Sequence, residues 1–236
     1  MSAFTGEFVG TALLIIMGDG VVANVVLNKS KGNGGGWIVI TFGWAMAVFM
    51  GVFIANKLGS GGHLNPAVTL ALAAFKDFDK TLIPAYLAGQ FAGAFAGAVI
   101  VWLAYKQHFD KTADKDLKLA VFCTGPAIRN TGFNLLTEII GAAVLMFAAL
   151  AISPSATSLG TLDALPVALV VLGIGLSLGG PTGYAINPAR DLGPRIAHFL
   201  LPIKNKRDSD WGYSWIPVVG PVIGAVAAAW IFSLLQ

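Results

Sequence analysis

The sequence predicts an all-α membrane protein with six transmembrane helices, two additional half-length helices and an inverted internal repeat. The first reason is composition: 56% of the 236 residues are hydrophobic and only 11% are charged, whereas a soluble domain has about 25% charged residues. The mean hydropathy of +0.75 agrees. This composition argues against a disordered chain or a nucleic-acid-binding protein, and a single cysteine argues against a disulfide scaffold.

The second observation is the number of long apolar segments. A bilayer core about 30 Å thick requires about 20 predominantly apolar residues in a spanning helix. The first apolar segment has no basic region before it and is too long for a cleaved signal, so it is predicted to be a retained span. The six predicted spans are roughly 4–27, 37–56, 82–105, 133–152, 164–182 and 214–235.

The third observation is a pair of shorter apolar segments, 66–75 and 188–201, each of which begins in an Asn-Pro-Ala triplet. Ten helical residues extend about 15 Å, which is half the membrane. Proline suits the first helical position because it has no N–H to leave unpaired. Asparagine directly before it is a favoured N-cap. Both triplets therefore predict the start of a half-helix.

The two halves of the chain also resemble each other. The segment Glu7–Gly10 corresponds to Glu138–Gly141, and the pair Gly93 and Gly97 corresponds to Gly220 and Gly224. Three full crossings per half would make the second copy enter from the opposite side, which predicts an inverted repeat. The predicted organisation is a single pore domain: a first repeat over 1–106, a polar linker over 107–132 and a second repeat over 133–236.

The paired half-helices predict a pore. Two half-helices that enter from opposite faces would meet with their positive N-termini at the midplane, which disfavours cations there. The asparagine amides could still donate hydrogen bonds to an uncharged solute. Irregular backbone at membrane depth requires burial or a wet cavity, and the glycine-containing segments 59–64 and 179–186 would line that cavity with carbonyl oxygens.

The two segments that contain the triplets, Gly62–Thr69 and Gly183–Asp191, resemble the signatures of the aquaporin superfamily. The resemblance covers essentially the whole chain, and both motifs are highly specific. Within the superfamily the sequence is similar to the bacterial glycerol facilitators, or aquaglyceroporins. The features that match this branch are Asp191, the pair Pro194-Arg195 and the pair Pro217-Val218.

The resemblance implies a role for each group of candidate residues. The selectivity constriction would consist of Trp44, Gly175, Tyr184 and Arg190. The pore centre would consist of Asn65, Pro66, Ala67, Asn187, Pro188 and Ala189. The backbone lining the pore would come from Gly62, His63, Leu64, Gly183, Ala185 and Ile186, with Glu7, Glu138 and Asp191 as supporting acids.

These features predict a passive channel for glycerol and other small uncharged solutes that excludes ions and protons. It would need no cofactor or metal and catalyse no reaction. Glycerol facilitators usually carry phenylalanine where this chain has Tyr184. The order among glycerol, water, dihydroxyacetone, urea, hydrogen peroxide and undissociated lactic acid therefore stays open. The resemblance also implies a homotetramer surrounded by membrane lipids, with no nucleic-acid partner.

Two alternatives remain. A water-dominant aquaporin is disfavoured because Gly175 stands where water-selective relatives carry histidine, and because Asp191 follows the second triplet. A secondary active transporter would need a coupling ion and a titratable group at the midplane. The candidates for that group are Glu7, Glu138 and His63.

The expected orientation conflicts with the charge distribution. The resemblance implies a cell-membrane protein with both termini in the cytoplasm. The connections that would then lie inside contain three Lys residues, whereas those outside contain ten Lys or Arg residues. The positive-inside rule favours the opposite orientation. Cytoplasmic termini are nevertheless the prediction.

Overall fold

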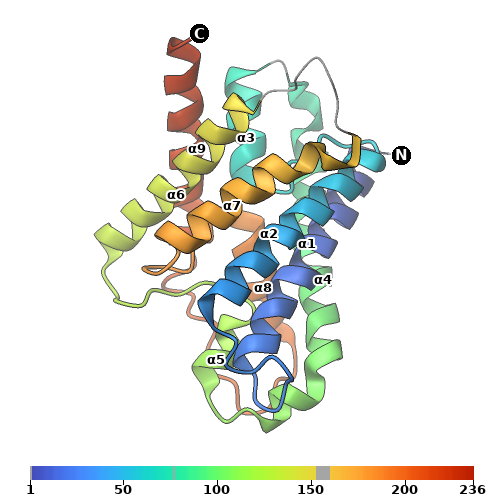
Figure 1. Cartoon of the computed structure of the whole chain (residues 1–236), viewed down its shortest axis with the longest axis vertical. Helices are drawn as coiled ribbons and strands as arrows, with labels where there is room; N and C mark the ends of the chain where they lie inside the picture. The colour runs from blue at the N-terminus through green and yellow to red at the C-terminus, as the bar shows by residue number, and fades with distance from the viewer. Residues whose placement is uncertain (1, 77, 153–159) are drawn as a thin grey trace.

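The computed structural model describes residues 2–76, 78–152 and 160–236, and the regular structure in these ranges is helical (Figure 1). This confirms the predicted all-α fold class. The helices are α1 (Ala3–Val26), α2 (Gly36–Lys57), α3 (Pro66–Phe75), α4 (Ile83–Lys111), α5 (Lys115–Ala120), α6 (Thr131–Ala151), α7 (Leu165–Leu178), α8 (Pro188–Leu200) and α9 (Ile216–Leu234). Short 3₁₀ turns, η1 (Lys80–Leu82) and η2 (Gly160–Ala164), precede α4 and α7.

Within the described ranges, five helices are long and apolar enough to cross a membrane: α1, α2, α4 with its preceding turn, α6 and α9. Large apolar side chains such as Ile38, Leu103 and Phe133 are exposed on their outer faces, as a lipid environment requires. The chain is therefore a multi-pass membrane protein.

The sixth predicted span, 164–182, is longer than the helix observed there. Helix α7 has 14 residues and ends at Leu178. The sequence that follows is Gly179-Gly180-Pro181, and the proline has no N–H to continue the helical hydrogen bonds. The predicted span was therefore too long, because residues 179–182 belong to the loop before α8.

The predicted polar linker 107–132 is also more helical than expected. Helix α4 continues to Lys111, beyond the predicted end of its span at 105. Within the linker, α5 is capped by Asp114, whose carboxylate accepts from the N–H groups of Asp116 and Leu117. The boundaries of the two repeats at 106 and 133 stay a prediction.

Both half-helices begin at the prolines of the triplets. The side chain of Asn65 caps α3 and that of Asn187 caps α8. Helix α3 ends at Phe75. Helix α8 ends at Leu200, where Pro202 follows two residues later. With 10 and 13 residues, neither helix can cross a bilayer.

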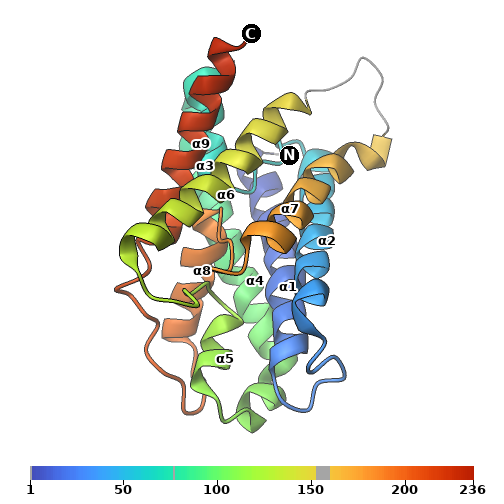
Figure 2. The same ribbon diagram turned by 60° about the vertical axis from the view of Figure 1, so that its left-hand side comes forward.

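The long helices pack in corresponding pairs, α1 on α4 and α6 on α9 (Figures 1 and 2). A methyl group at Gly93 of α4 would lie 2.3 Å from the carbonyl oxygen of Phe8. The corresponding methyl group at Gly224 of α9 would lie 2.1 Å from the carbonyl oxygen of Ile139. The two glycines thus permit the same close backbone approach at equivalent places in the two halves.

Each half-helix packs against a long helix from the other half of the chain: α3 against α9, and α8 against α4. Helices α2 and α7 also pack against each other. Both ends of the chain lie toward one end of the molecule, and α5 lies at the opposite end (Figures 1 and 2). This arrangement brings the N-terminal ends of α3 and α8 together in the interior.

Candidate functional site: a narrow pore

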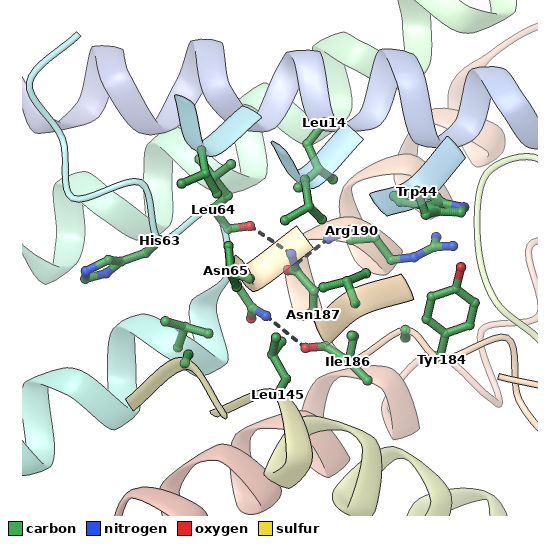
Figure 3. Close-up of a pocket in the computed structure, with 17 residues that line it drawn as sticks. Leu14, Trp44, His63, Leu64, Asn65, Leu145, Tyr184, Ile186, Asn187 and Arg190 are labelled. Carbon is green, nitrogen blue, oxygen red and sulfur yellow. Dashed lines mark hydrogen bonds between the residues drawn. The ribbon is translucent and has the colours of Figure 1, made fainter. Parts of the chain in front are cut away.

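The two capping asparagines lie close together in one cavity (Figure 3). Asn65 Nδ2 donates to the carbonyl oxygen of Ile186 at 2.8 Å, and Asn187 Nδ2 donates to the carbonyl oxygen of Leu64 at 2.8 Å. Each amide therefore bridges to the loop of the other half-helix. An amide NH₂ group has two donors, so each asparagine retains one N–H for a molecule in the passage.

The oxygen of each asparagine amide stays with its own half-helix. Asn65 Oδ1 accepts from the N–H of Ala67 at 2.9 Å. Asn187 Oδ1 accepts from the N–H of Ala189 at 3.0 Å and of Arg190 at 3.2 Å. Because each amide oxygen is held in this way, the orientation of the side chain is fixed and its NH₂ group donates to the other loop. Pro66, Ala67, Pro188 and Ala189 are buried within the half-helices and do not line the cavity.

Glu7 of α1 holds the loop before α3. Its Oε1 accepts from the N–H of His63 and from Ser60 Oγ, both at 3.0 Å. Its Oε2 accepts from the N–H of Leu64 and from Gln90 Nε2, both at 2.7 Å. Four donors therefore surround one fully buried carboxylate.

Glu138 of α6 does the same for the loop before α8. Its Oε1 accepts from Thr182 Oγ1 at 2.7 Å and from the N–H of Ala185 at 3.0 Å. Its Oε2 accepts from the N–H of Ile186 at 2.8 Å. The correspondence with Glu7 extends to the individual positions, since each acid binds the N–H of the residue immediately before the capping asparagine.

Both loops contain residues in left-handed backbone conformations. Leu64 has a φ of 52°, Ile186 of 45° and Tyr184 of 40°. Such conformations cost about 1–3 kcal/mol each in residues other than glycine and persist only where surrounding contacts impose them. The glutamate bonds are such contacts, and the resulting backbone directs the Leu64 and Ile186 carbonyls at the opposite asparagines.

Two cavities lie along the axis of the site. The inner cavity, of about 100 Å³, contains both asparagines and extends from His63 to Arg190. The outer cavity, of about 260 Å³, includes Gly183 and the segment Cys123–Ala127. Trp44, Tyr184 and Arg190 line both cavities, so these three side chains form the boundary between them.

At this boundary the Arg190 guanidinium carbon lies 4.0 Å from the centre of the Trp44 ring. Tyr184 completes the group, with its ring edge toward Trp37 at a centroid distance of 5.9 Å. Figure 3 shows Trp44, Arg190 and Tyr184 at one end of the site and His63 at the other. The constriction therefore combines aromatic rings with a guanidinium group that carries hydrogen-bond donors.

Gly175 lies behind Tyr184. It belongs to the lining of neither cavity, because Tyr184 covers it: a methyl group at Gly175 would lie 2.9 Å from the Tyr184 ring. Its carbonyl oxygen accepts from Trp37 Nε1 at 2.9 Å. The absence of a side chain at Gly175 makes room for the aromatic group.

Asp191 is a support for the loops around the constriction. Its Oδ2 accepts from the N–H and Oγ1 of Thr124, at 2.8 and 2.7 Å. Its Oδ1 accepts from Arg195, and the same arginine donates to the carbonyl oxygens of Thr124 and Ser209. Asp191 thus pairs with Arg195, and Arg190 is left free of this ion pair.

Several residues that support the loops or the constriction were not identified from the sequence. The Asp191–Arg195 pair has a four-residue helical spacing that could have indicated it. Gln90 links Glu7 to Thr69 Oγ1, and Trp37 reaches the constriction from the first turn of α2. Both depend on helix packing, and no local pattern in the sequence predicts them.

Among the predicted backbone residues, His63, Leu64, Ala185 and Ile186 line the inner cavity. Gly183 lines only the outer cavity. Gly62 belongs to neither and lies against Asn56 of α2 with a φ of 63°. His63 Nδ1 lies 3.1 Å from Thr69 Oγ1, and its ring packs at 4.6 Å from that of Tyr86.

Paired half-helices, a central asparagine pair and a narrow two-sided constriction define a multi-pass membrane protein with a narrow internal passage. Residues 1–232 match the family described as major intrinsic protein, and the chain belongs to this family. The resemblance to the aquaporin superfamily and its glycerol-facilitator branch is thereby confirmed.

Named relatives are similar over essentially their full length. A probable glycerol uptake facilitator protein of Thermotoga maritima is 57% identical over 235 residues, with 100% of each chain covered. The glycerol uptake facilitator protein of Streptococcus pneumoniae is 52% identical over 236 residues, with 99% of each covered. The X-ray structure of the aquaglyceroporin from Plasmodium falciparum matches with a TM-score of 0.86 and 31% identity, covering 98% of this chain and 94% of that one.

Proposed function

We propose that this protein is a passive channel for glycerol and other small uncharged solutes, and that it excludes ions and protons. The observation that carries the proposal is the constriction at which Trp44, Tyr184 and Arg190 divide the inner from the outer cavity. The names of the similar proteins, glycerol uptake facilitators and an aquaglyceroporin, support the same solute class.

The constriction suits a molecule with one apolar and one polar side. The CH groups of glycerol would face the rings of Trp44 and Tyr184, and its hydroxyl groups would accept from Arg190. Replacing lost hydration by fixed hydrogen bonds is the general basis of selectivity in narrow pores. A polyol can contact the aromatic rings with its CH groups and bond the guanidinium with its hydroxyl groups at the same time, whereas an inorganic ion cannot.

The centre of the pore would then exclude protons and cations. The N-termini of α3 and α8 contribute about half a positive charge each where Asn65 and Asn187 meet. The free N–H of each amide donates to the oxygen of a passing solute, so a chain of water molecules is interrupted there. The apolar wall formed by residues such as Val48, Val68 and Leu145 offers no alternative partner for a proton.

The structure favours a channel over a secondary transporter for a specific reason. A transporter needs a carboxyl group free to bind and release a coupling ion, yet the two acids that the sequence offers for that role are held by the backbone: Glu7 by the loop before α3 and Glu138 by the loop before α8. Releasing either acid would disturb the pore itself. We further propose that the protein catalyses no reaction, because these acids serve as braces.

We propose that the protein resides in the cell membrane with both termini in the cytoplasm, as a homotetramer with a separate pore in each subunit. The exposed apolar side chains of the spanning helices support a lipid-facing surface. Membrane lipids and small neutral solutes are the proposed partners, and no nucleic acid is involved.

The test is stopped-flow light scattering on proteoliposomes, with protein-free vesicles as the control. In glycerol the proteoliposomes are expected to shrink and then reswell quickly, whereas in an impermeant sugar they should only shrink. The reswelling rate should be insensitive to a proton or sodium gradient. Fast shrinkage without reswelling would identify a water-dominant channel, and dependence on a gradient would identify a transporter.

A further inference from the structure

The side chain of Tyr184 is held at the constriction by packing. Glu138 accepts hydrogen bonds from the backbone of the two residues that follow, Ala185 and Ile186. The Tyr184 hydroxyl has no hydrogen-bond partner among the described residues, and the backbone there has a φ of 40°. A left-handed conformation of this kind persists only where surrounding contacts impose it. The position of the Tyr184 side chain therefore depends on what its ring packs against.

Trp37, in the first turn of α2, packs against this ring from the side of the outer cavity. It lines the outer cavity and not the inner one. The planes of the Trp37 and Tyr184 rings meet at 78°, with their centroids 5.9 Å apart. A methyl group at Gly179, which follows α7, would lie 2.5 Å from Tyr184 and 2.7 Å from Trp37. The Tyr184 ring thus fills a slot between Trp37 and the end of α7.

The indole N–H fixes Trp37 in turn. Its Nε1 donates to the carbonyl oxygen of Gly175 at 2.9 Å. Helix α7 ends at Leu178, so Gly175 carries one of the last four carbonyl groups, which have no N–H partner within the helix. Trp37 therefore caps the end of α7 and joins it to the first turn of α2.

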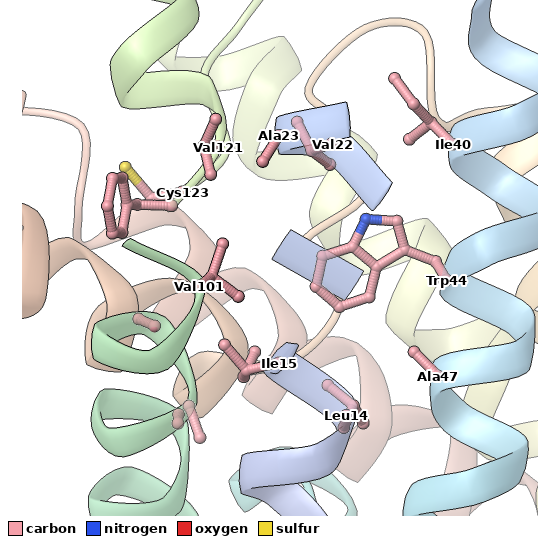
Figure 4. Packing of buried hydrophobic residues seen from close by; sticks show 14 of the residues in the cluster. Leu14, Ile15, Val22, Ala23, Ile40, Trp44, Ala47, Val101, Val121 and Cys123 are labelled. Atoms are coloured by element: carbon pink, nitrogen blue, oxygen red, sulfur yellow. The ribbon is translucent and has the colours of Figure 1, made fainter. Parts of the chain in front are cut away.

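Helix α2 also carries Trp44, another ring of the constriction. Trp44 follows Trp37 by seven residues, or about two helical turns, so both side chains project from the same face of α2. Trp44 is itself firmly packed: a methyl group at Gly18 of α1 would lie 2.2 Å from its ring, and Figure 4 shows the ring directed toward α1. Helix α2 thus holds Trp44 directly and Tyr184 through Trp37, which sets the separation between these two rings of the pore.

We propose that Trp37 is a positioning residue that sets the size limit of the pore by holding the Tyr184 ring in its slot. This inference rests on the proposed channel function and adds a specificity determinant to it. Without the Trp37 indole, the Tyr184 ring has room to turn toward the outer cavity. The constriction then widens and admits polyols that are broader than glycerol.

The test measures the permeation of glycerol and of the branched polyol pentaerythritol by stopped-flow light scattering on proteoliposomes. The two solutes share their hydroxyl chemistry and differ in width. Trp37→Ala is expected to raise the pentaerythritol-to-glycerol permeability ratio by about tenfold or more, the low end of what one methylene of extra bulk costs in a tight site. A merely structural defect would slow both solutes alike and leave the ratio unchanged.

Trp215→Ala is the matched control. Trp215, which precedes α9, has the same 41% exposure as Trp37 and lines neither cavity, so its removal should leave the ratio unchanged. The proposal is overturned if Trp37→Ala conducts glycerol with the ratio of the unmodified protein. If Trp37→Ala does not fold, Trp37→Phe replaces it, because phenylalanine keeps a ring and loses the indole N–H. A raised ratio in Trp37→Phe supports the proposal, and an unchanged ratio overturns it.

A second background separates positioning from direct contact with the solute. In Tyr184→Ala the ring that Trp37 holds is absent, so adding Trp37→Ala should not raise the ratio further. If Trp37→Ala raises the ratio equally in both backgrounds, Trp37 acts on the solute directly and the proposal is overturned.

Failure of the proposed function gives a different result. If the unmodified protein conducts water and no glycerol, the proposed solute is wrong, and glycerol permeation that appears in Trp37→Ala still supports the role of Trp37. If no glycerol permeation appears there either, the role of Trp37 is overturned as well.

Discussion

At the scale of single residues, Tyr184 distinguishes this constriction from the usual pattern of glycerol facilitators. Its hydroxyl is buried and has no hydrogen-bond partner among the described residues. The ring is held against Gly175 and Trp37. The hydroxyl therefore adds a polar atom to the aromatic wall without contributing to the packing that holds the wall in place.

Changing Tyr184 to phenylalanine is expected to increase the glycerol-to-water permeability ratio by about two- to fivefold. This corresponds to roughly the net value of one hydrogen bond, for the polar atom that the tyrosine adds to the aromatic wall. Stopped-flow measurements with glycerol and with an impermeant sugar give the ratio. Tyr105→Phe removes a phenol hydroxyl from the α4 region outside both pore cavities and serves as the control. A ratio unchanged by Tyr184→Phe would contradict the assigned role of this wall.

At the scale of elements, close helix packing determines whether the loops can reach the centre. Glu138 lies on α6, and a methyl group at Gly220 of α9 would be 2.8 Å from its Cβ. Helix α3 also packs against α9, so α9 supports both the brace of one loop and the half-helix that follows the other. The geometry of the pore therefore depends on the approach of α9 to α6.

Gly224→Ala should separate α9 from α6, since the new methyl group would meet the Ile139 backbone. Overpacking of this kind costs about 1–3 kcal/mol. We expect a lower Tm, measured by size-exclusion chromatography of the detergent-solubilised protein after heating. Gly173→Ala is the matched control because a methyl group on Gly173 of α7 meets nothing within 4 Å. Equal melting temperatures for the two variants would contradict this account.

At the scale of the whole molecule, the basic loops that conflict with the proposed orientation have structural partners. Lys206 Nζ donates to the carbonyl oxygens of His198, Phe199 and Leu201 at the end of α8. Lys118 Nζ donates to the carbonyl oxygen of Lys204 at 2.6 Å, and burial lowers the pKa of Lys118. These lysines stabilise the loops, which gives a reason for their presence other than retention in the cytoplasm.

Arg129 and Arg207 of the same loops form ion pairs, with Asp210 and Asp116 respectively. We therefore expect epitope tags on both termini to be inaccessible in intact cells and accessible after permeabilisation. A tag in the loop between Lys111 and Lys115 should be accessible in both conditions. Labelling of the terminal tags in intact cells would reverse the proposed orientation.

Much of the fold could be predicted from local chemistry. Asn-Pro at each half-helix start combines a cap with a residue that lacks an N–H, so the first residues of α3 and α8 followed directly from the sequence. Span lengths were less accurate. The predicted span 164–182 ran past the end of α7 at Leu178 into loop residues 179–182, and hydropathy ended the prediction of α4 before its polar last turns.

The candidate site was predicted where the residue type carries the chemistry, as for the two capping asparagines, and where the resemblance supplied the position, as for Arg190. It was not predictable where a partner comes from a distant helix. Gly175 was predicted to belong to the constriction, and its contact with the Tyr184 ring became visible only in the structure.

The sequence by itself determined the membrane environment, the inverted repeat and the paired half-helices, because hydropathy, proline and asparagine act within a few residues. Only the tertiary structure decided which side chains line the constriction, which acid serves each loop and which buried charges are paired. These outcomes depend on helices that are far apart in the chain and close in space, where a single turn of a helix changes which group is reached.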